Sequence, residues 1–114
     1  MNDLTLDSDA EELQLLRESA LTFSKKSLSP GRLRKLRENN LSFDKETWMQ
    51  FGQFGWCSLL IPEKFGGLGL SLRHMTVILE ELGKSLLPEP LAPVSVLSTL
   101  LITRCSNEKL KHKL

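Results

Sequence analysis

The sequence predicts an all-α protein, a bundle of four or five helices. Apolar residues recur at three- and four-residue steps in several segments, whereas no segment alternates convincingly between apolar and polar residues as a strand would. Prolines, glycines and asparagines separate these segments, so the connections are short. With 114 residues, 40% of them apolar and 25% charged, residues 1–114 have the size and composition of a single globular domain.

The first predicted helix covers about residues 9–27, and residues 1–8 before it are expected to be flexible. Ser8 and Glu11 have the spacing of a capping box, in which each side chain satisfies a free backbone donor at the helix start. Pro30 ends the helix. Its apolar face consists of Leu13, Leu16, Ala20 and Phe23.

A basic segment follows this helix. It holds six of the fifteen basic residues, namely Lys25, Lys26, Arg32, Arg34, Lys35 and Arg37. A nucleic-acid patch is one interpretation, but no aromatic residue lies among the charges to stack on bases, and the net charge is only +1. We therefore predict a solvated loop between helices and no nucleic-acid partner.

The next predicted helix is shorter and begins at Asp44, a good N-cap residue. It carries Trp48 and Phe51 toward the core, and Gly55 supplies the positive-φ residue just past its end. The apolar run 56–61 could pass for a buried strand, but the chain offers no partner strand. We predict an extended segment there instead.

A second long amphipathic helix is predicted from Ser71, its expected N-cap, to about Leu86. Its apolar stripe is broad, so this helix is expected at the centre of the bundle. The stripe contains Leu72, Met75, Val77, Ile78, Leu79, Leu82 and Leu86.

Three prolines, Pro88, Pro90 and Pro93, separate that helix from the next. Pro93 suits a first helical turn, because its missing N–H has no partner to lose there. The helix is predicted to continue through Val94, Leu97, Leu100, Leu101 and Arg104. Ser106 or Asn107 can cap a last helix that carries Leu110 and Leu114 and stops on its own apolar stripe, as a fragment would.

Few residues have the pattern of a catalytic or binding site. Gly66, Gly67 and Gly69 precede a helix, yet a phosphate cradle would need a preceding strand in a βαβ unit, so a structural turn is favoured. Glu80 and Glu81 are adjacent and point about 100° apart on a helix, so a solvated face with one salt bridge is favoured over an acid/base pair. We expect no catalytic residue in the chain.

The remaining soft ligands do not form a metal site. Cys57 and Cys105 lie far apart and have only His74, expected to be a surface histidine, and His112 as further donors. Two reduced thiols in an intracellular protein are expected, with no metal. The acidic first twelve residues differ from a transit peptide and favour a bacterial cytoplasm. The longest apolar stretch, 91–102, is too short to span a membrane.

The segment from Trp48 to Leu82 resembles the N-terminal helical domain of the flavin-dependent acyl-CoA dehydrogenases. The resemblance rests on Trp48, Gly55, Trp56, Pro62, Glu63, Phe65, Gly66, Gly67, Gly69, Glu80, Glu81, Leu82 and Gly83. It runs from about Leu13 to Leu114, and the chain is expected to end where the middle β-domain of that family begins. We therefore expect a fragment that lacks the middle and C-terminal domains.

The resemblance implies a function in lipid catabolism. The complete enzyme is expected to use FAD to oxidise an acyl-CoA to its 2-enoyl form, as an oligomer, with an electron-transferring flavoprotein as acceptor. In that family the catalytic glutamate and most of the flavin site lie in the later domains. Residues 1–114 alone are thus expected to be inactive, and no flavin-contacting residue is assigned.

The same resemblance points to an acyl-pocket wall on the helix that follows Glu80 to Gly83. By position, this wall consists of Pro90, Pro93, Val94 and Leu97; ordinary core packing is the equally weighted alternative. The proline-rich sequence there is similar to that of bacterial relatives acting on bulky, branched or sterol-derived thioesters. A different hypothesis is a free-standing helical module that binds an acyl thioester or complements a separately encoded remainder of the enzyme.

Overall fold

A computed structural model describes residues 3–114 of the chain, with side chains from Ser8 onward. The described residues form helices and turns without a strand, which confirms the all-α prediction. The elements in chain order are α1 (Asp3–Ser27), α2 (Arg32–Glu38), α3 (Lys45–Gln53), the 3₁₀ turn η1 (Glu63–Phe65), α4 (Leu72–Gly83), the π-helical segment η2 (Pro93–Ser98), α5 (Thr99–Thr103) and α6 (Glu108–Lys113).

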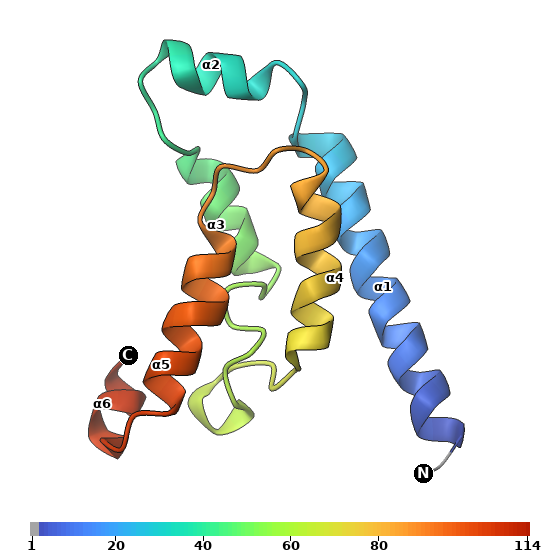
Figure 1. Cartoon of the computed structure of the whole chain (residues 1–114), viewed down its shortest axis with the longest axis vertical. Helices are drawn as coiled ribbons and strands as arrows, with labels where there is room; N and C mark the ends of the chain where they lie inside the picture. The colour runs from blue at the N-terminus through green and yellow to red at the C-terminus, as the bar shows by residue number, and fades with distance from the viewer. Residues whose placement is uncertain (1–2) are drawn as a thin grey trace.

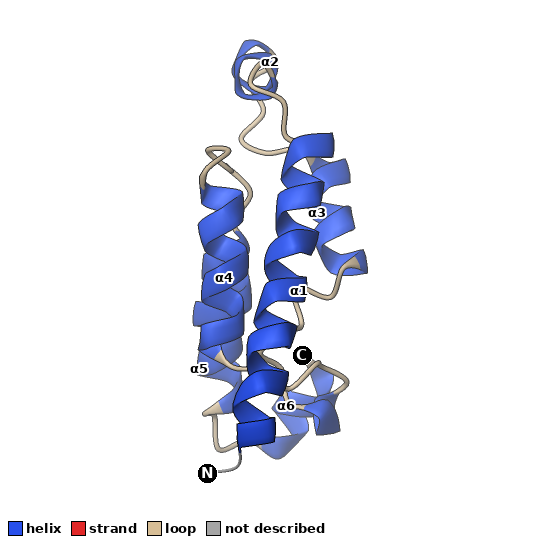
Figure 2. Cartoon of the chain, turned by 90° about the vertical axis from the view of Figure 1, so that its right-hand side faces the viewer, coloured by secondary structure: helices blue, strands red, loops and turns tan. Residues whose placement is uncertain are grey.

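Four rods make up the bundle. α1 and α4 run side by side in the same direction, while α3 and the continuous rod of η2 and α5 run the opposite way (Figures 1 and 2). α2 lies across one end of the bundle, and α6 lies at the other end beside the C-terminus (Figure 1). Within residues 3–114 no helix is both long and apolar enough to cross a membrane.

The core lies between these rods and is centred on α4, as the sequence predicts. Met75, Ile78 and Leu82 of α4 are completely buried. Phe23 of α1 packs edge-on against Phe51 and Trp56, with ring centroids 5.4 and 5.5 Å apart. The buried cluster is completed by Ala20, Leu28, Leu59 and Leu91.

The predicted caps form at several helix ends. The Asp44 carboxylate accepts hydrogen bonds from the backbone N–H groups of Glu46 and Thr47, both at 3.3 Å. Gly55 has a φ of 78° just past α3. Ser71 caps α4, and the side-chain oxygen of Asn107 accepts a 3.1 Å hydrogen bond from the Leu110 N–H at the start of α6.

The predicted start of the first helix and the predicted basic loop are both wrong. α1 already includes Asp3, so Ser8 lies inside the helix and forms no capping box with Glu11. Residues 1–2, part of the segment expected to be flexible, lie outside the described residues. The predicted basic loop contains helix α2, because leucine, arginine and lysine are good helix formers. Leu36 of this helix is buried.

Two further predictions about the chain path need correction. The segment 56–61 is folded into successive turns and is not extended, and the Ser58 N–H donates to the Gly55 carbonyl at 3.2 Å. The carbonyls of Ser58 and Leu59 accept from the N–H groups of Leu68 and Leu70, at 3.1 and 2.9 Å. Turn bonds and the returning chain thus satisfy these polar groups without a partner strand. α4 ends at Gly83, three residues earlier than predicted, and Leu86 lies beyond it with a φ of 52°.

Candidate functional site

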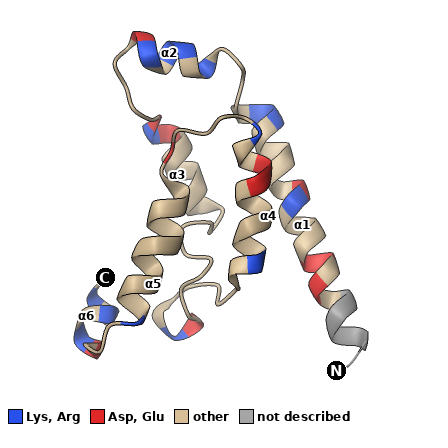
Figure 3. Cartoon of the chain, in the orientation of Figure 1, with Lys and Arg blue, Asp and Glu red and all other residues tan. Residues whose placement is uncertain are grey.

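An apolar groove of about 430 Å³ lies between α4 and η2. It is lined by Leu72, Met75, Thr76 and Leu79 from α4 and by Ala92, Pro93, Val96 and Leu97 at the start of the facing rod. No charged side chain lines it. Figure 3 shows that the facing rod, η2 with α5, carries no charged residue along its length.

The structure brings three of the four predicted wall residues to this region. Pro93 and Leu97 line the groove, and Pro90 lines an adjoining hollow of about 390 Å³ at the bend between α4 and η2. The two spaces share Leu79, Ala92 and Pro93 as a common border. Val94 lines neither space and is partly exposed on the same helix. The role of these residues in substrate binding stays a prediction.

Sequence reasoning missed the opposite wall, which α4 provides. Leu72, Met75, Thr76 and Leu79 are spaced by three and four residues, so they share one helix face. Thr76 adds no free donor, because its hydroxyl donates to the carbonyl of Leu72 at 2.8 Å. The signal in the sequence was the breadth of the apolar stripe on α4. The stripe is broader than the face that packs in the core, so its remaining residues form a second apolar face.

The π-helical turn anchors η2 to the core. Ser95 is completely buried and its hydroxyl donates to the Trp56 carbonyl at 3.0 Å. The hydroxyls of Ser98 and Thr99 donate to the carbonyls five residues before them, at 3.1 and 3.4 Å. π-Turns of this kind are frequent at functional sites.

A buried ion pair lies at the bend beside the groove. The Glu89 side chain is completely buried, pairs with the guanidinium of Arg32 and accepts a 3.1 Å hydrogen bond from the Asp44 N–H. Burial lowers the pKa of the Arg32 guanidinium from its usual value. The Thr47 hydroxyl, ahead of other contacts, lowers the pKa of Asp44 below its usual value.

The glycine loop, which contains Pro62, Glu63, Phe65, Gly66, Gly67 and Gly69, is a compact turn. Gly66 and Gly69 have positive φ values of 87° and 63°. A Cβ on Gly67 would overlap the carbonyl oxygen and the Cβ of Ile61. The N–H groups of all three glycines donate to carbonyls within residues 61–63, so none of these donors is free to cradle a phosphate.

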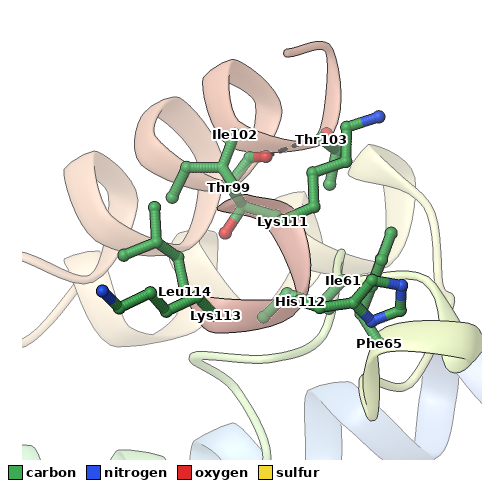
Figure 4. A pocket seen from close by; sticks show the side chains of 9 residues that line it. All are labelled: Ile61, Phe65, Thr99, Ile102, Thr103, Lys111, His112, Lys113 and Leu114. Carbon is green, nitrogen blue, oxygen red and sulfur yellow. Dashed lines mark hydrogen bonds between the residues drawn. The ribbon is translucent and has the colours of Figure 1, made fainter. Parts of the chain in front are cut away.

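A second cavity, of about 230 Å³, lies between this loop and the last two helices (Figure 4). The ring of Phe65 lies edge-on to that of His112, with centroids 4.8 Å apart. The hydroxyl of Thr103, which faces the cavity in Figure 4, donates to the carbonyl of Thr99 at 2.8 Å. The other lining residues are Ile61, Ile102, Lys111, Lys113 and Leu114.

The adjacent carboxylates of α4 have different surroundings. Glu80 is exposed, as predicted for both, but Glu81 is only 4% exposed and pairs with Arg17 at 2.7 Å and Lys84 at 3.0 Å. The expectation of a solvated face is therefore wrong for Glu81. Hydrogen bonds from Lys84 and Arg17 lower the pKa of this carboxyl, which is opposite to the shift expected of a general base that works near neutral pH.

His74 is a capping residue of α4, so its assignment as a surface histidine is wrong. Its side chain is 12% exposed. Nδ1 accepts a 3.2 Å hydrogen bond from the Ser71 N–H, and Nε2 lies 3.2 Å from a carboxylate oxygen of Glu12 on α1.

Burial raises the pKa of the Cys57 thiol. Among the side chains described, those of residues 8–114, no three His, Cys, Asp or Glu residues converge as metal ligands.

Comparison of the amino-acid sequence with known proteins identifies related chains. The family model described as acyl-CoA dehydrogenase, N-terminal domain, matches residues 10–114. Acyl-CoA dehydrogenase IpdE2 of Mycolicibacterium smegmatis is 38% identical over 104 residues, which are 90% of this chain and 33% of that protein. The protein of the same name from Mycobacterium tuberculosis is 34% identical over 71% of this chain and 26% of its own length.

A more distant relative is the cyclohex-1-ene-1-carbonyl-CoA dehydrogenase of Syntrophus aciditrophicus, 33% identical over 74% of this chain and 19% of its own length. The chain thus spans a third or less of the length of these curated relatives. No solved structure matches the chain significantly.

Proposed function

Because this chain belongs to the acyl-CoA dehydrogenase family and carries its N-terminal domain, we propose that it supplies one wall of the acyl-binding pocket of an FAD-dependent enzyme. That enzyme oxidises an acyl-CoA thioester to the 2-enoyl form. In this assignment the partners of the domain are the acyl-CoA, the other dehydrogenase domains in an oligomer and an electron-transferring flavoprotein.

The groove between α4 and η2 is the observation that carries this proposal. It is apolar, open to solvent and bordered by the prolines that follow α4. Each methylene of an acyl chain that leaves water there contributes about 0.8 kcal/mol. A groove without charged or free polar groups favours the hydrocarbon part of a substrate over its thioester or nucleotide part.

The chemical step is assigned to other parts of the enzyme. The buried carboxylate Glu81 is held ionised by two cations, which suits an ion pair better than proton abstraction. FAD supplies hydride acceptance in this family, but the residues described here do not fit it: the loop amides that could hold its phosphates bond within the loop. Residues 1–114 alone are therefore proposed to be inactive and to elute from gel filtration without FAD.

The acyl substrate is proposed to be bulky. Pro90 and Pro93 give the groove border rigid, non-extendable side chains, and the Syntrophus relative is named for a cyclic acyl thioester. Fixed ring side chains leave the border little freedom to close around a thin, straight chain. A cyclohexanecarbonyl-CoA is accordingly expected to bind more tightly than a straight-chain thioester of the same carbon number.

The test is isothermal titration of the chain with acetyl-, heptanoyl- and cyclohexanecarbonyl-CoA. Leu97→Trp fills the groove and is expected to weaken binding of the longer and cyclic thioesters at least tenfold. Leu101→Trp is the matched control, because Leu101 lies on the same rod, is 65% exposed and does not line the groove. Equal affinities for all three thioesters, or equal losses in both variants, would contradict the proposal.

A free-standing interaction module is the second candidate function. It is favoured by the exposure of Val94, Leu97 and Leu101 in one stripe, at 38%, 60% and 65%. A stripe of this kind suits a protein partner that covers the rod. Tight binding of an apolar partner to a chain that shows no affinity for any acyl-CoA would favour this candidate over the first.

A further inference from the structure

The segment that borders the groove makes few polar contacts of its own, although Leu91 within it packs in the core. Residues 84–92 lie between α4 and η2, and together with Pro93, the first residue of η2, they contain three prolines without an N–H group. Around Glu89 the Leu91 N–H donates to the Glu89 carbonyl at 2.8 Å and the Val94 N–H donates to the Pro90 carbonyl at 3.2 Å. Figure 1 shows this segment passing the start of α3, beneath α2.

Glu89 is the polar tether between this segment and the rest of the described chain. Its Oε1 pairs with Arg32 of α2 and accepts the hydrogen bond from the N–H of Asp44, the residue that caps α3. Its Oε2 is buried without a hydrogen-bond partner among the described residues. Arg32 is thus the one described cation that compensates a carboxylate taken fully out of water.

We propose that Arg32 is a positioning residue of the groove: by compensating Glu89, it holds the 88–93 segment against the start of α3 and so sets where Pro93 stands opposite α4. The identity of the ligand rests on the proposed function, whereas the positioning does not. Arg32 lies far from the groove in sequence and does not line it.

The chemistry of a buried ion pair favours this role over simple stabilisation. Well-packed apolar side chains could replace the pair at little cost to stability, but they would specify direction and distance less strictly than a contact between two charged groups. Removing Arg32 alone leaves Glu89 buried without a counter-charge, so the carboxylate must move toward water or take up a proton. Because Pro88 and Pro90 flank Glu89 directly, its movement is transmitted to the border of the groove.

The test follows the methyl resonances of the chain by ¹³C NMR without any ligand. In Arg32→Met, the methyl signals of Val96 and Leu97 are expected to shift, while that of Leu59, completely buried in the core, stays in place. Arg34→Met is the matched control, since Arg34 is an exposed residue of the same short helix and is expected to leave all these signals unchanged. The charge swap Arg32→Glu with Glu89→Arg is expected to return the groove signals toward their original positions.

Other outcomes overturn the proposal. Groove methyls that keep their positions in Arg32→Met, or that shift no more than the core methyl, would show that the pair does not position the groove. If Arg32→Met fails to fold, Glu89→Gln takes its place, because it removes the charge and keeps an acceptor for the Asp44 N–H; unchanged groove signals in that variant overturn the proposal as well. Shifted methyls in a chain that binds no acyl-CoA would support the positioning and refute the proposed function.

Discussion

At the scale of single residues, charge pairing decides what the carboxylates of this domain can do. Glu81 and Glu89 are both buried, and each lies against an arginine from a distant part of the chain, Arg17 and Arg32. A carboxylate held by a cation stays ionised and fixed in place. These residues therefore serve the architecture, and the groove is left to apolar side chains.

Acid is expected to destabilise the domain through Glu81. Its folded-state pKa is lowered from the usual 4.5, so its contribution to stability is present above that value and is lost as the pH falls through the lower folded value. Glu81→Gln should reduce the stability at pH 7 and flatten the loss below about pH 4.5. Urea unfolding between pH 7 and pH 3 measures this effect, and Glu80→Gln, at the exposed neighbouring position, is the control. If Glu81→Gln left the pH dependence of the free energy of unfolding unchanged, the role of the ion pair would be contradicted.

At the scale of elements, local chemistry accounts for where the helices begin and end. α4 begins at a capping box made by Ser71 and His74, and α3 begins at the carboxylate of Asp44. The glycine loop between them is a tight turn because backbone from two places meets at Gly67. The loop thus acts as a structural corner that directs the chain from the turns after α3 into α4.

Two glycine substitutions are expected to have opposite effects. Gly52 lies inside α3, and a Cβ added there would meet no atom within 4 Å, so Gly52→Ala should raise the free energy of unfolding by about 0.5–1 kcal/mol. Gly67→Ala should lower it by about 1–3 kcal/mol, because the new Cβ overlaps Ile61. Thermal and urea unfolding measure both. A destabilised Gly52→Ala would mean that the α3 backbone needs glycine for a reason other than space.

At the scale of the whole molecule, the arrangement of the rods creates the groove. α4 has its core face covered by α1, α3 and the turns after α3, and its second face meets η2 only in part. The Pro88–Pro93 bend keeps the two rods apart at one end. On the rod of η2 and α5, Val94, Leu97 and Leu101 remain exposed, and Leu97 also lines the groove.

The exposed stripe is expected to bind a hydrophobic dye. Folded chain 1–114 should raise the fluorescence of anilinonaphthalene sulfonate, because Leu97 and Leu101 are exposed next to an open apolar groove. Leu97→Ser with Leu101→Ser should reduce the signal several-fold. Leu15→Ser, at a similarly exposed leucine on α1 outside this groove, serves as the control. Equal dye fluorescence with the unchanged chain, the double serine variant and Leu15→Ser would mean that the dye binds at another surface.

Much of the fold could be predicted because it depends on interactions within a few residues. Helical periodicity identifies the faces of α1, α3 and α4 that enter the core, and side-chain caps identify Asp44 and Ser71 as helix starts. For the last helix the sequence offered Ser106 or Asn107, and the structure shows Asn107 as the cap. The basic segment forms a helix, contrary to the prediction, because its residues are good helix formers and Leu36 becomes buried in the folded chain, which its charge pattern does not indicate. The turns of 56–61 were missed for a related reason, since composition cannot distinguish a buried strand from buried turns.

Membership in the acyl-CoA dehydrogenase family, as its helical N-terminal domain, could be read from the amino-acid sequence, because periodicity, caps and the glycine-loop motif are local features. Which helix faces meet is known from the folded chain alone. The fold places the second face of α4 opposite Pro93 and Leu97, and it pairs Arg17 with Glu81 and Arg32 with Glu89. Contacts between residues that are far apart in the sequence depend on the path of the chain between them. That path runs through bends and turns whose conformation is set by the packing of the whole core.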